Sequence, residues 1–258
     1  MSANREVALS IRSISKALKE RRQNFQSGQP LGQPDPPQPL EVKSPFQTLV
    51  ARLKSSWDQD ATLERRKYLV DKFQRPHYQY MTELKRLGGK LFAAPTALVP
   101  ADQAKYLPNL AVRDGHGKRA ELKDLAQGKV RSVSAPTTGA PTPAAAADAT
   151  PATVGDARVQ HLRVHVIENA LKAAVLRPFL RSMARHVTPD DRARFLFHFR
   201  PIDRIKDELF MDNMAMGWVF LVDPQWRIRW YANGEPKPEE VERLLAMTSQ
   251  LVKEMPQA

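Results

Sequence analysis

Residues 217–230 read GWVFLVDPQWRIRW, the stretch of this sequence that most restricts how the chain can fold. Two runs of aromatic and β-branched residues, which favour strands, flank an Asp-Pro pair, which favours a tight turn. We therefore expect a buried β-hairpin in which alternate side chains point to opposite faces of a sheet. This alternation predicts that Ile228 and Trp230 face the core, whereas Arg227 and Arg229 face outward.

The two arginines of this hairpin allow two interpretations. In the first, solvent or acidic residues of the last helix, such as Glu239 or Glu242, satisfy both guanidinium groups. In the second, Arg227 and Arg229 form a basic recognition strip on the sheet, because arginine is enriched at protein interfaces. The sequence leaves both interpretations open.

The last half of the chain alternates between strand-like and helix-like patterns. The predicted strands are 129–135, 158–167, 194–199, 217–223 and 227–232, and the predicted helices are 168–186, 202–213 and 235–255. Upstream, a turn at 114–118 precedes a short predicted helix at 120–129. The order β-β-α-β-α-β-β-α predicts an α/β fold, a thioredoxin-like sheet with covering helices.

The chain contains no cysteine, which limits the chemistry that such a sheet can support. Thioredoxin-like enzymes place a thiol at a helix N-terminus after the first core strand, where the helix dipole lowers the thiol pKa. Here a Pro/Ala/Thr-rich tract at 136–156 follows the strand at 129–135, and its composition predicts a disordered insertion. We therefore expect the fold without its redox site.

Other catalytic and metal-binding patterns are weak. His161 and His165 share one face of a predicted strand, but a metal site needs three or four converging ligands, so a half-exposed strand is the more ordinary interpretation. Asp190 and Asp191 follow a Thr-Pro pair and are typical of a helix start rather than an acid–base pair. The sequence shows no glycine-rich phosphate loop and no nucleophile elbow. It therefore predicts no catalytic residue, no metal site and no cofactor.

Positive charge is concentrated in the first part of the chain. The formal net charge is +12; residues 1–154 contain 24 Lys+Arg against 14 Asp+Glu, whereas residues 155–258 contain 16 against 14. A basic region of this kind can meet nucleic acid, anionic lipid or an acidic protein. Most of the excess positive charge therefore belongs to the N-terminal part of the chain, and the C-terminal fold is nearly balanced.

Four segments are expected along the chain. Residues 1–27 contain an amphipathic, Ser- and Arg-rich pattern that is typical of a mitochondrial targeting segment, with an ordinary surface helix as the alternative. Residues 28–43 form a Pro-rich spacer that we expect to pack no core. Residues 44–90 are a basic helical region, and residues 91–258 are the thioredoxin-like domain with 136–156 as its insertion.

Several stretches together resemble a known family, the mitochondrial assembly factors of the ATP synthase membrane sector. The matching stretches are 88–110, 124–134, 166–187 and 211–244. The last is the most specific, because an Asn precedes a Gly-aromatic-Val strand that ends in Asp, and Ile-Arg-Trp and a Gly-Glu helix start follow. The sequence departs from the family at 136–156, where relatives keep a more regular segment.

The resemblance implies a non-catalytic chaperone on the matrix side of the mitochondrial inner membrane. Its client would be newly made ATP synthase subunit a, which it would help to join the subunit c ring, and its contact with the membrane would be peripheral. The resemblance also implies a presequence. Together with the basic strip of the hairpin, which supplies Arg227, it gives five candidate partner-binding residues. These are Asn169, Asn213, Arg227, Arg229 and Trp230, with structural roles as the alternative, and Asp223 is a further position matching the motif.

A second class of function follows from the charge alone. An organellar RNA-associated or ribosome-associated protein would also be strongly basic. The sequence lacks the basic patches interleaved with aromatic residues that RNA-binding sheets use, so we expect no nucleic-acid partner.

Overall fold

The computed structural model describes residues 20, 25–40, 82, 84–126, 128–135, 158–168, 189–211, 213 and 216–255. Within these residues, one mixed seven-stranded sheet has the strand order β2-β1-β5-β4-β3-β6-β7. The strands are β1 (Ala111–Arg113), β2 (Arg119–Glu121), β3 (Val130–Ala135), β4 (Val159–Val166), β5 (Phe195–His198), β6 (Trp218–Val222) and β7 (Ile228–Asn233). Strands β3, β4 and β5 are parallel neighbours, and β6 and β7 form an antiparallel hairpin beside β3.

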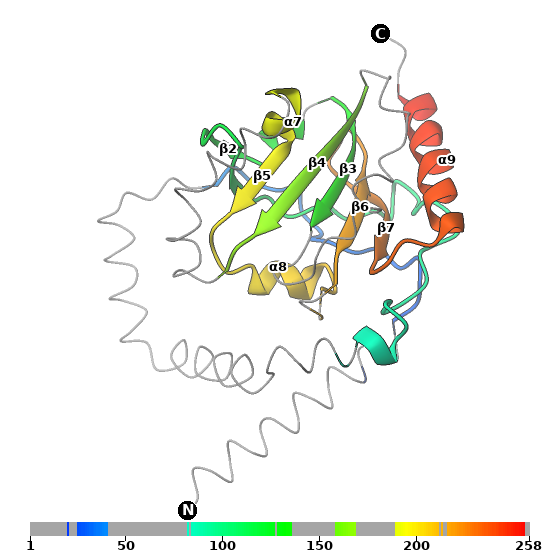
Figure 1. Ribbon diagram of the computed structural model, residues 1–258. Coiled ribbons are helices and arrows are strands. Elements are labelled where there is room, and N and C mark those ends of the chain that lie inside the picture. The colour runs from blue at the N-terminus through cyan, green and yellow to red at the C-terminus, as the bar shows by residue number, and fades with distance from the viewer. Residues whose placement is uncertain are drawn as a thin grey trace, which may run out of the picture.

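Among the described residues, α-helices and one 3₁₀ helix accompany the sheet. They are η1 (Asp124–Ala126), α7 (Pro189–Arg194), α8 (Asp203–Glu208) and α9 (Pro238–Glu254). Helix α9 lies along the β6–β7 side of the sheet, whereas α7 and α8 lie at opposite ends of the strands (Figure 1). None of the helices among the described residues combines the length and apolar character needed to cross a membrane.

The predicted α/β architecture is confirmed, including every strand predicted after residue 128 and the final helix. The parallel β3-β4-β5 unit followed by the β6–β7 hairpin and α9 is the sheet that the thioredoxin-like prediction requires. Helix α7 begins at Pro189, as the Asp190-Asp191 pattern predicts. The tract at 136–156 and most of the predicted helix at 168–186 lie outside the described residues.

Two local predictions are wrong. The segment 120–129 contains the end of β2 and the short η1 rather than an α-helix. The helix expected at 202–213 is only α8, because Phe210 adopts a left-handed backbone conformation with φ 59°, which no α-helix can continue through. Strands β1 and β2 were also not predicted, since three residues are too few to show an alternating pattern.

The sheet separates two apolar cores. On one face, side chains of β3, β4, β5, β6 and β7 pack with residues from the N-terminal part of the chain, including Leu31, Leu107 and Leu122. On the other face, Val130, Leu221 and Trp230 pack against α9 through its buried residues Met247, Leu251 and Val252. This packing gives each buried strand an apolar layer on at least one side, which is the main stabilising term for such a sheet.

The open edge of β7 is covered by a segment that contributes no strand of its own. Val99 N–H donates to the Arg229 carbonyl (2.7 Å), Ile228 N–H to Lys105 (2.8 Å) and Leu107 N–H to Trp226 (3.1 Å). The segment 99–107 therefore satisfies the backbone groups that an edge strand would otherwise leave unpaired.

Residues 25–40, which we name the N-terminal strap, lie against the first core. Leu31 is 5% exposed and belongs to that core, and Gln33 and Tyr106 exchange two backbone hydrogen bonds of 2.9 Å. Farther on, the Leu40 N–H donates to the Glu121 carboxylate (3.0 Å). The expectation that the Pro-rich spacer packs no core is therefore wrong, because composition does not show that a single leucine in it reaches a preformed apolar surface.

Candidate functional site

The candidate site begins at the turn between β6 and β7. The Asp223 carboxylate accepts hydrogen bonds from the backbone N–H groups of Gln225 (3.0 Å) and Arg227 (2.9 Å). Trp226 has a left-handed φ of 72°, and its N–H donates to the Asp223 carbonyl (2.9 Å). Asp223 thus organises the predicted Asp-Pro turn through its own side chain, the usual role of Asp at such a position.

Arg227 is bound to the same turn. Its Nε donates to Asp223 (2.9 Å), its Nη1 to the Ala101 carbonyl (3.0 Å) and its Nη2 to Gln225 (3.2 Å). The side chain is 24% exposed, so part of the guanidinium remains accessible. Arg227 ties the turn to the segment that covers the β7 edge.

Arg229 is buried rather than outward-facing, so that prediction is wrong. It is 6% exposed; its Nε donates to the Val99 carbonyl (2.7 Å), and its Nη1 lies 3.3 Å from Glu254 and 3.7 Å from Asp223. The acidic partner on the last helix is Glu254, not Glu239 or Glu242. A guanidinium shared by two carboxylates and a carbonyl is a cross-link between β7 and the end of α9.

An irregularity in the hairpin explains the error. Leu221 pairs with Trp230 but Val222 pairs with Ile228, so Arg229 is the extra residue of a β-bulge. A bulge breaks the alternation of side chains along the strand. Ile228 therefore belongs to the first core and Trp230 to the second, on opposite faces of the sheet, although both are buried as predicted.

Trp230 is an anchor of the second core. It is 1% exposed, and its indole N–H donates to the Pro95 carbonyl (2.8 Å). Asn213 is also buried, at 0% exposed, while Asn169 lies outside the described residues. Of the candidate partner-binding residues that the structure describes, Arg227 alone has a partly exposed side chain. Partner binding by these five residues stays a prediction.

A polar clamp at the start of α9 was not recognised from the sequence. The Lys90 ammonium lies 2.6 Å from the Glu240 carboxylate, and Asn233 accepts from the Leu91 N–H (2.7 Å) and donates to the Phe92 carbonyl (3.2 Å). The Ala94 N–H also donates to Glu240 (3.3 Å). These bonds attach residues 90–94 to the end of β7 and the first turn of α9.

The clamp stabilises the charged form of a buried carboxylate. Burial alone would raise the pKa of Glu240, but the hydrogen bond and charge of Lys90 and the N–H groups of Lys237 and Ala94 outweigh it and lower the pKa. Gly89 and Gly234 make this approach possible, because a Cβ at Gly234 would lie far inside contact distance of the Gly89 carbonyl oxygen. Both glycines are visible in the sequence, but Gly89 and Gly234 are far apart along the chain, so no local pattern predicts that they meet.

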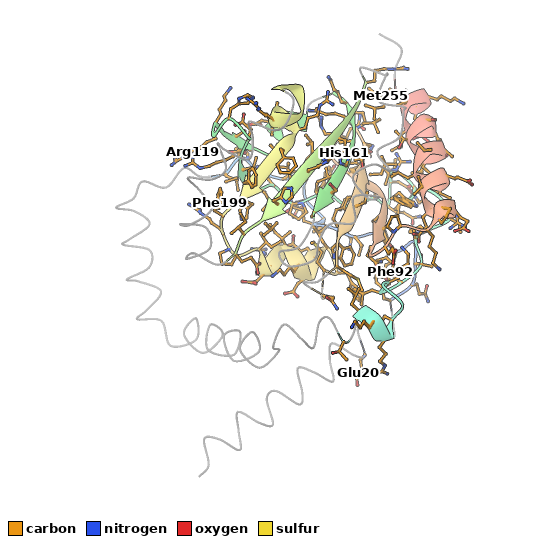
Figure 2. The ribbon with its side chains drawn as sticks, viewed as in Figure 1. Glu20, Phe92, Arg119, His161, Phe199 and Met255 are labelled. Carbon is orange, nitrogen blue, oxygen red and sulfur yellow. The ribbon has the colours of Figure 1, made fainter. Side chains whose placement is uncertain are left out.

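The centre of the sheet carries two neutral histidines. Burial, reinforced by the positive charge of Arg163, lowers the pKa of His161 and of His165 to about 4. His165 stacks on Phe195 and Phe197 at centroid distances of 4.4 and 5.5 Å, and Figure 2 shows His161 on β4 in the middle of the sheet. Among the described residues, no three His, Cys, Asp or Glu side chains converge as a metal site would require.

These features define the class of protein: an α/β sheet protein of the thioredoxin-like kind, without cysteine, whose polar side chains bind one another across the β7 edge. The family can be named as well. A model of the family described as "ATP10 protein" matches residues 12–251, so the chain belongs to this family. The resemblance drawn from the sequence is confirmed.

Curated relatives of the chain carry the name "Mitochondrial ATPase complex subunit ATP10". The protein of that name from Saccharomyces cerevisiae is 30% identical over 223 residues, covering 77% of this chain and 78% of its own length. The one from Candida glabrata is 26% identical over 215 residues, covering 78% of each chain.

Solved structures give weaker similarities. BsSco, a member of the Sco family of cytochrome c oxidase assembly proteins, has a TM-score of 0.43 and 12% identity, over 57% of this chain and 94% of its own. A secreted thiol-disulfide isomerase from Corynebacterium glutamicum has a TM-score of 0.42 and 15% identity, over 60% and 90%.

Proposed function

We propose that the chain is a non-catalytic assembly factor for the membrane sector of mitochondrial ATP synthase. In this proposal it binds newly made subunit a, promotes its joining to the subunit c ring, and acts at the matrix side of the inner membrane as a peripheral protein. The observation that carries the proposal is the family match across residues 12–251, together with the name of the yeast relatives.

The residue types support binding over catalysis. A chain without cysteine has no thiol for the exchange chemistry of thioredoxin-like enzymes. The carboxylates and arginines at the β7 edge bind one another and backbone groups, so the structure gives them a structural role. We expect no cofactor and no small-molecule substrate.

Charge supports a position at a membrane surface. Basic residues near an anionic leaflet contribute about 1 kcal/mol each to attraction. The basic helical region predicted at 44–90 would supply them, in keeping with the net positive charge of the N-terminal part of the chain.

Affinity purification from mitochondria, with and without nuclease, tests the proposal. We expect ATP synthase subunits a and c to be recovered equally in both samples, identified by mass spectrometry. Recovery of ribosomal proteins that is lost after nuclease treatment would instead establish the RNA-associated alternative.

Import tests the predicted targeting segment. The boundary at residue 27 needs care, because Phe25 and Ser27 contact the domain: the Ser27 hydroxyl donates to the Ala93 carbonyl (2.7 Å). A deletion of residues 1–24 leaves these contacts in place, and we expect it to abolish mitochondrial import without loss of stability. Normal import of the truncated chain would show that targeting depends on other residues.

A further inference from the structure

The N-terminal strap is bound in a manner that resembles a peptide in a receptor. Phe25 inserts its ring between Phe92 and Phe210, with centroid distances of 4.4 and 4.3 Å, and lies 6.3 Å from the ring of Tyr231. Phe92 itself packs on Trp218 (5.7 Å) and Tyr231 (5.6 Å). Figure 2 shows Phe92 near the β7 side of the sheet. The floor under Phe25 is therefore an aromatic cluster built by segments distant in the sequence.

The strap backbone supplies most of the polar contacts. The Tyr231 hydroxyl donates to the Gln29 carbonyl (2.9 Å) and accepts from the Gly28 N–H (3.0 Å). The Gly32 N–H donates to the Glu208 carbonyl (3.0 Å), and Gln33 pairs with Tyr106. The strap follows a turned path, because the Gln29 N–H donates to the Gln26 carbonyl (3.1 Å) and Gly28 and Gly32 have positive φ values of 95° and 114°. Hydrogen bonds to the backbone do not depend on side-chain identity, whereas pockets for a few side chains set the preference.

The floor of the groove contains a strained residue. Phe210, directly beneath Phe25, has φ 59°, a left-handed conformation that is unfavourable for a bulky side chain. Strain of this kind clusters at binding sites, where the surrounding structure maintains it. The conformation turns the chain after α8 so that the Phe210 ring meets the strap.

We propose that this groove, floored by Phe92, Phe210, Trp218 and Tyr231, is a binding site for an apolar segment of the client. In the free protein, residues 25–33 occupy it as an internal ligand. The partner chemistry follows from that occupant: an aromatic residue, a glycine three positions later, and a Leu-Gly pair six and seven positions later, as in Phe25, Gly28, Leu31 and Gly32. This inference rests on the proposed assembly function, since a membrane subunit that is not yet assembled exposes apolar side chains.

The strap is suited to exchange with a partner. Residues 25–40 contain no helix and only the single bridge at Gln33, so their release would leave the sheet ladder paired, although it would remove Leu31 from the first core. Because the strap is tethered to the groove, it competes at a high effective concentration. A client segment must therefore bind the groove more tightly than the strap does, or bind when the strap contacts are weakened. The groove would then stay closed until a suitable apolar segment is present.

A peptide experiment on the full chain tests the groove itself. A fluorescent peptide of residues 23–35 should bind the Phe25→Ala/Leu31→Ala variant at least tenfold more tightly than the wild type, because the cis strap of the variant competes poorly. The same peptide with Phe25→Ala should bind at least tenfold more weakly. Absence of saturable binding to the variant, when its circular dichroism matches the wild type, would overturn the inference.

A disulfide lock tests whether the client uses the groove. Gln33 and Tyr106 form a hydrogen-bonded antiparallel pair, for which Cα atoms lie about 5.5 Å apart, within the range for a disulfide. Because the chain lacks cysteine, the Gln33→Cys/Tyr106→Cys variant forms one defined bridge. A matched lock at the β1–β2 pair, Arg113→Cys/Arg119→Cys, leaves the strap free and controls for oxidation.

The readout is capture of ATP synthase subunits a and c, detected by antibody, from detergent-solubilised mitochondrial membranes. We expect oxidation of the strap lock to reduce capture at least fivefold and oxidation of the control lock to leave capture unchanged. Equal capture by the oxidised and reduced strap lock would overturn the inference while the proposed function stands. If the wild-type protein captures neither subunit, the proposed function is wrong, and so is the assignment of the client. The peptide experiment still decides whether the groove binds an apolar segment.

Discussion

The C-terminal hairpin and the N-terminal strap reverse the roles that their sequences indicate. The hairpin contains the charged and aromatic residues that suggest a recognition surface, yet Arg229 and Trp230 are buried and bound internally. The strap has the composition of a flexible spacer, yet Leu31 lies in the first core and Phe25 in an aromatic cluster. Residue type therefore predicts how a segment can interact, and the partner within the fold decides whether it remains accessible.

The largest expected effect tests the hairpin as scaffold. Trp230→Ala should lower the free energy of unfolding by about 3–5 kcal/mol, because it deletes a large buried aromatic ring and leaves a cavity under α9. Urea unfolding followed by circular dichroism measures the change. Trp230→Phe retains part of the packing and should cost less; equal losses for the two variants would show that the hydrogen bond to Pro95, not the ring volume, is decisive.

The strap should show the next largest effect. Leu31→Ala should cost about 2–4 kcal/mol if the strap belongs to the folded domain, because Leu31 is 5% exposed within the first core. The matched control is Gln38→Ala at an exposed position of the same strap, which should change the unfolding free energy by less than about 0.5 kcal/mol. A Leu31→Ala loss no larger than the control would restore the interpretation of residues 28–43 as a spacer.

The two arginines of the hairpin sharpen the contrast between a buried and an accessible charge. Arg229→Ala should cost about 3 kcal/mol, because it leaves Asp223 and the Val99 carbonyl with fewer partners in a buried setting. Arg227→Ala should cost about 1 kcal/mol, since its side chain is more exposed. Thermal unfolding of both variants checks the order. If Arg227→Ala proves the more destabilising, Arg229 does not act as the cross-link between β7 and α9.

The last expected effect is a pH dependence that belongs to neither region. The pKa of His161 and of His165 is about 4 in the folded chain, below the ordinary value of 6.5. A lowered histidine pKa means that the unfolded chain binds more protons between those values, so stability is greatest above about pH 6.5 and falls on acidification. At pH 5 we expect a loss of about 1–2 kcal/mol per histidine, from urea unfolding.

Two controls distinguish titration of the sheet histidines from effects of the strap and the hairpin. His161→Gln should reduce the loss between pH 7.5 and pH 5. The strap and the hairpin contain no histidine, so the cost of Leu31→Ala should be the same at both pH values. A cost that depends on pH would mean that strap docking is coupled to the titration of the sheet. Below about pH 5, protonation of Glu240 should add a further loss, because its pKa is lowered by the clamp.

The sequence alone determined strands β3 to β7, the turn and the last helix, and it excluded thiol chemistry. Alternating β-branched and aromatic residues predicted β3 to β7, the Asp-Pro pair predicted the turn at Asp223, and the periodic pattern after Lys237 predicted α9. The absence of cysteine determined that the sheet carries no dithiol chemistry. These features depend on local sequence or on composition, so they can be predicted without knowing which segments of the chain contact one another.

Only the tertiary structure decided where the polar and apolar side chains of the proposed site lie. One extra residue at Arg229 reversed the faces of β7, because a bulge depends on the pairing partner as well as on the strand. The Lys90–Glu240 clamp and the seat of Phe25 join residues far apart in the chain. Periodicity within one segment carries no information about such contacts, since burial of a charge or a ring depends on the surface that the rest of the fold brings to it.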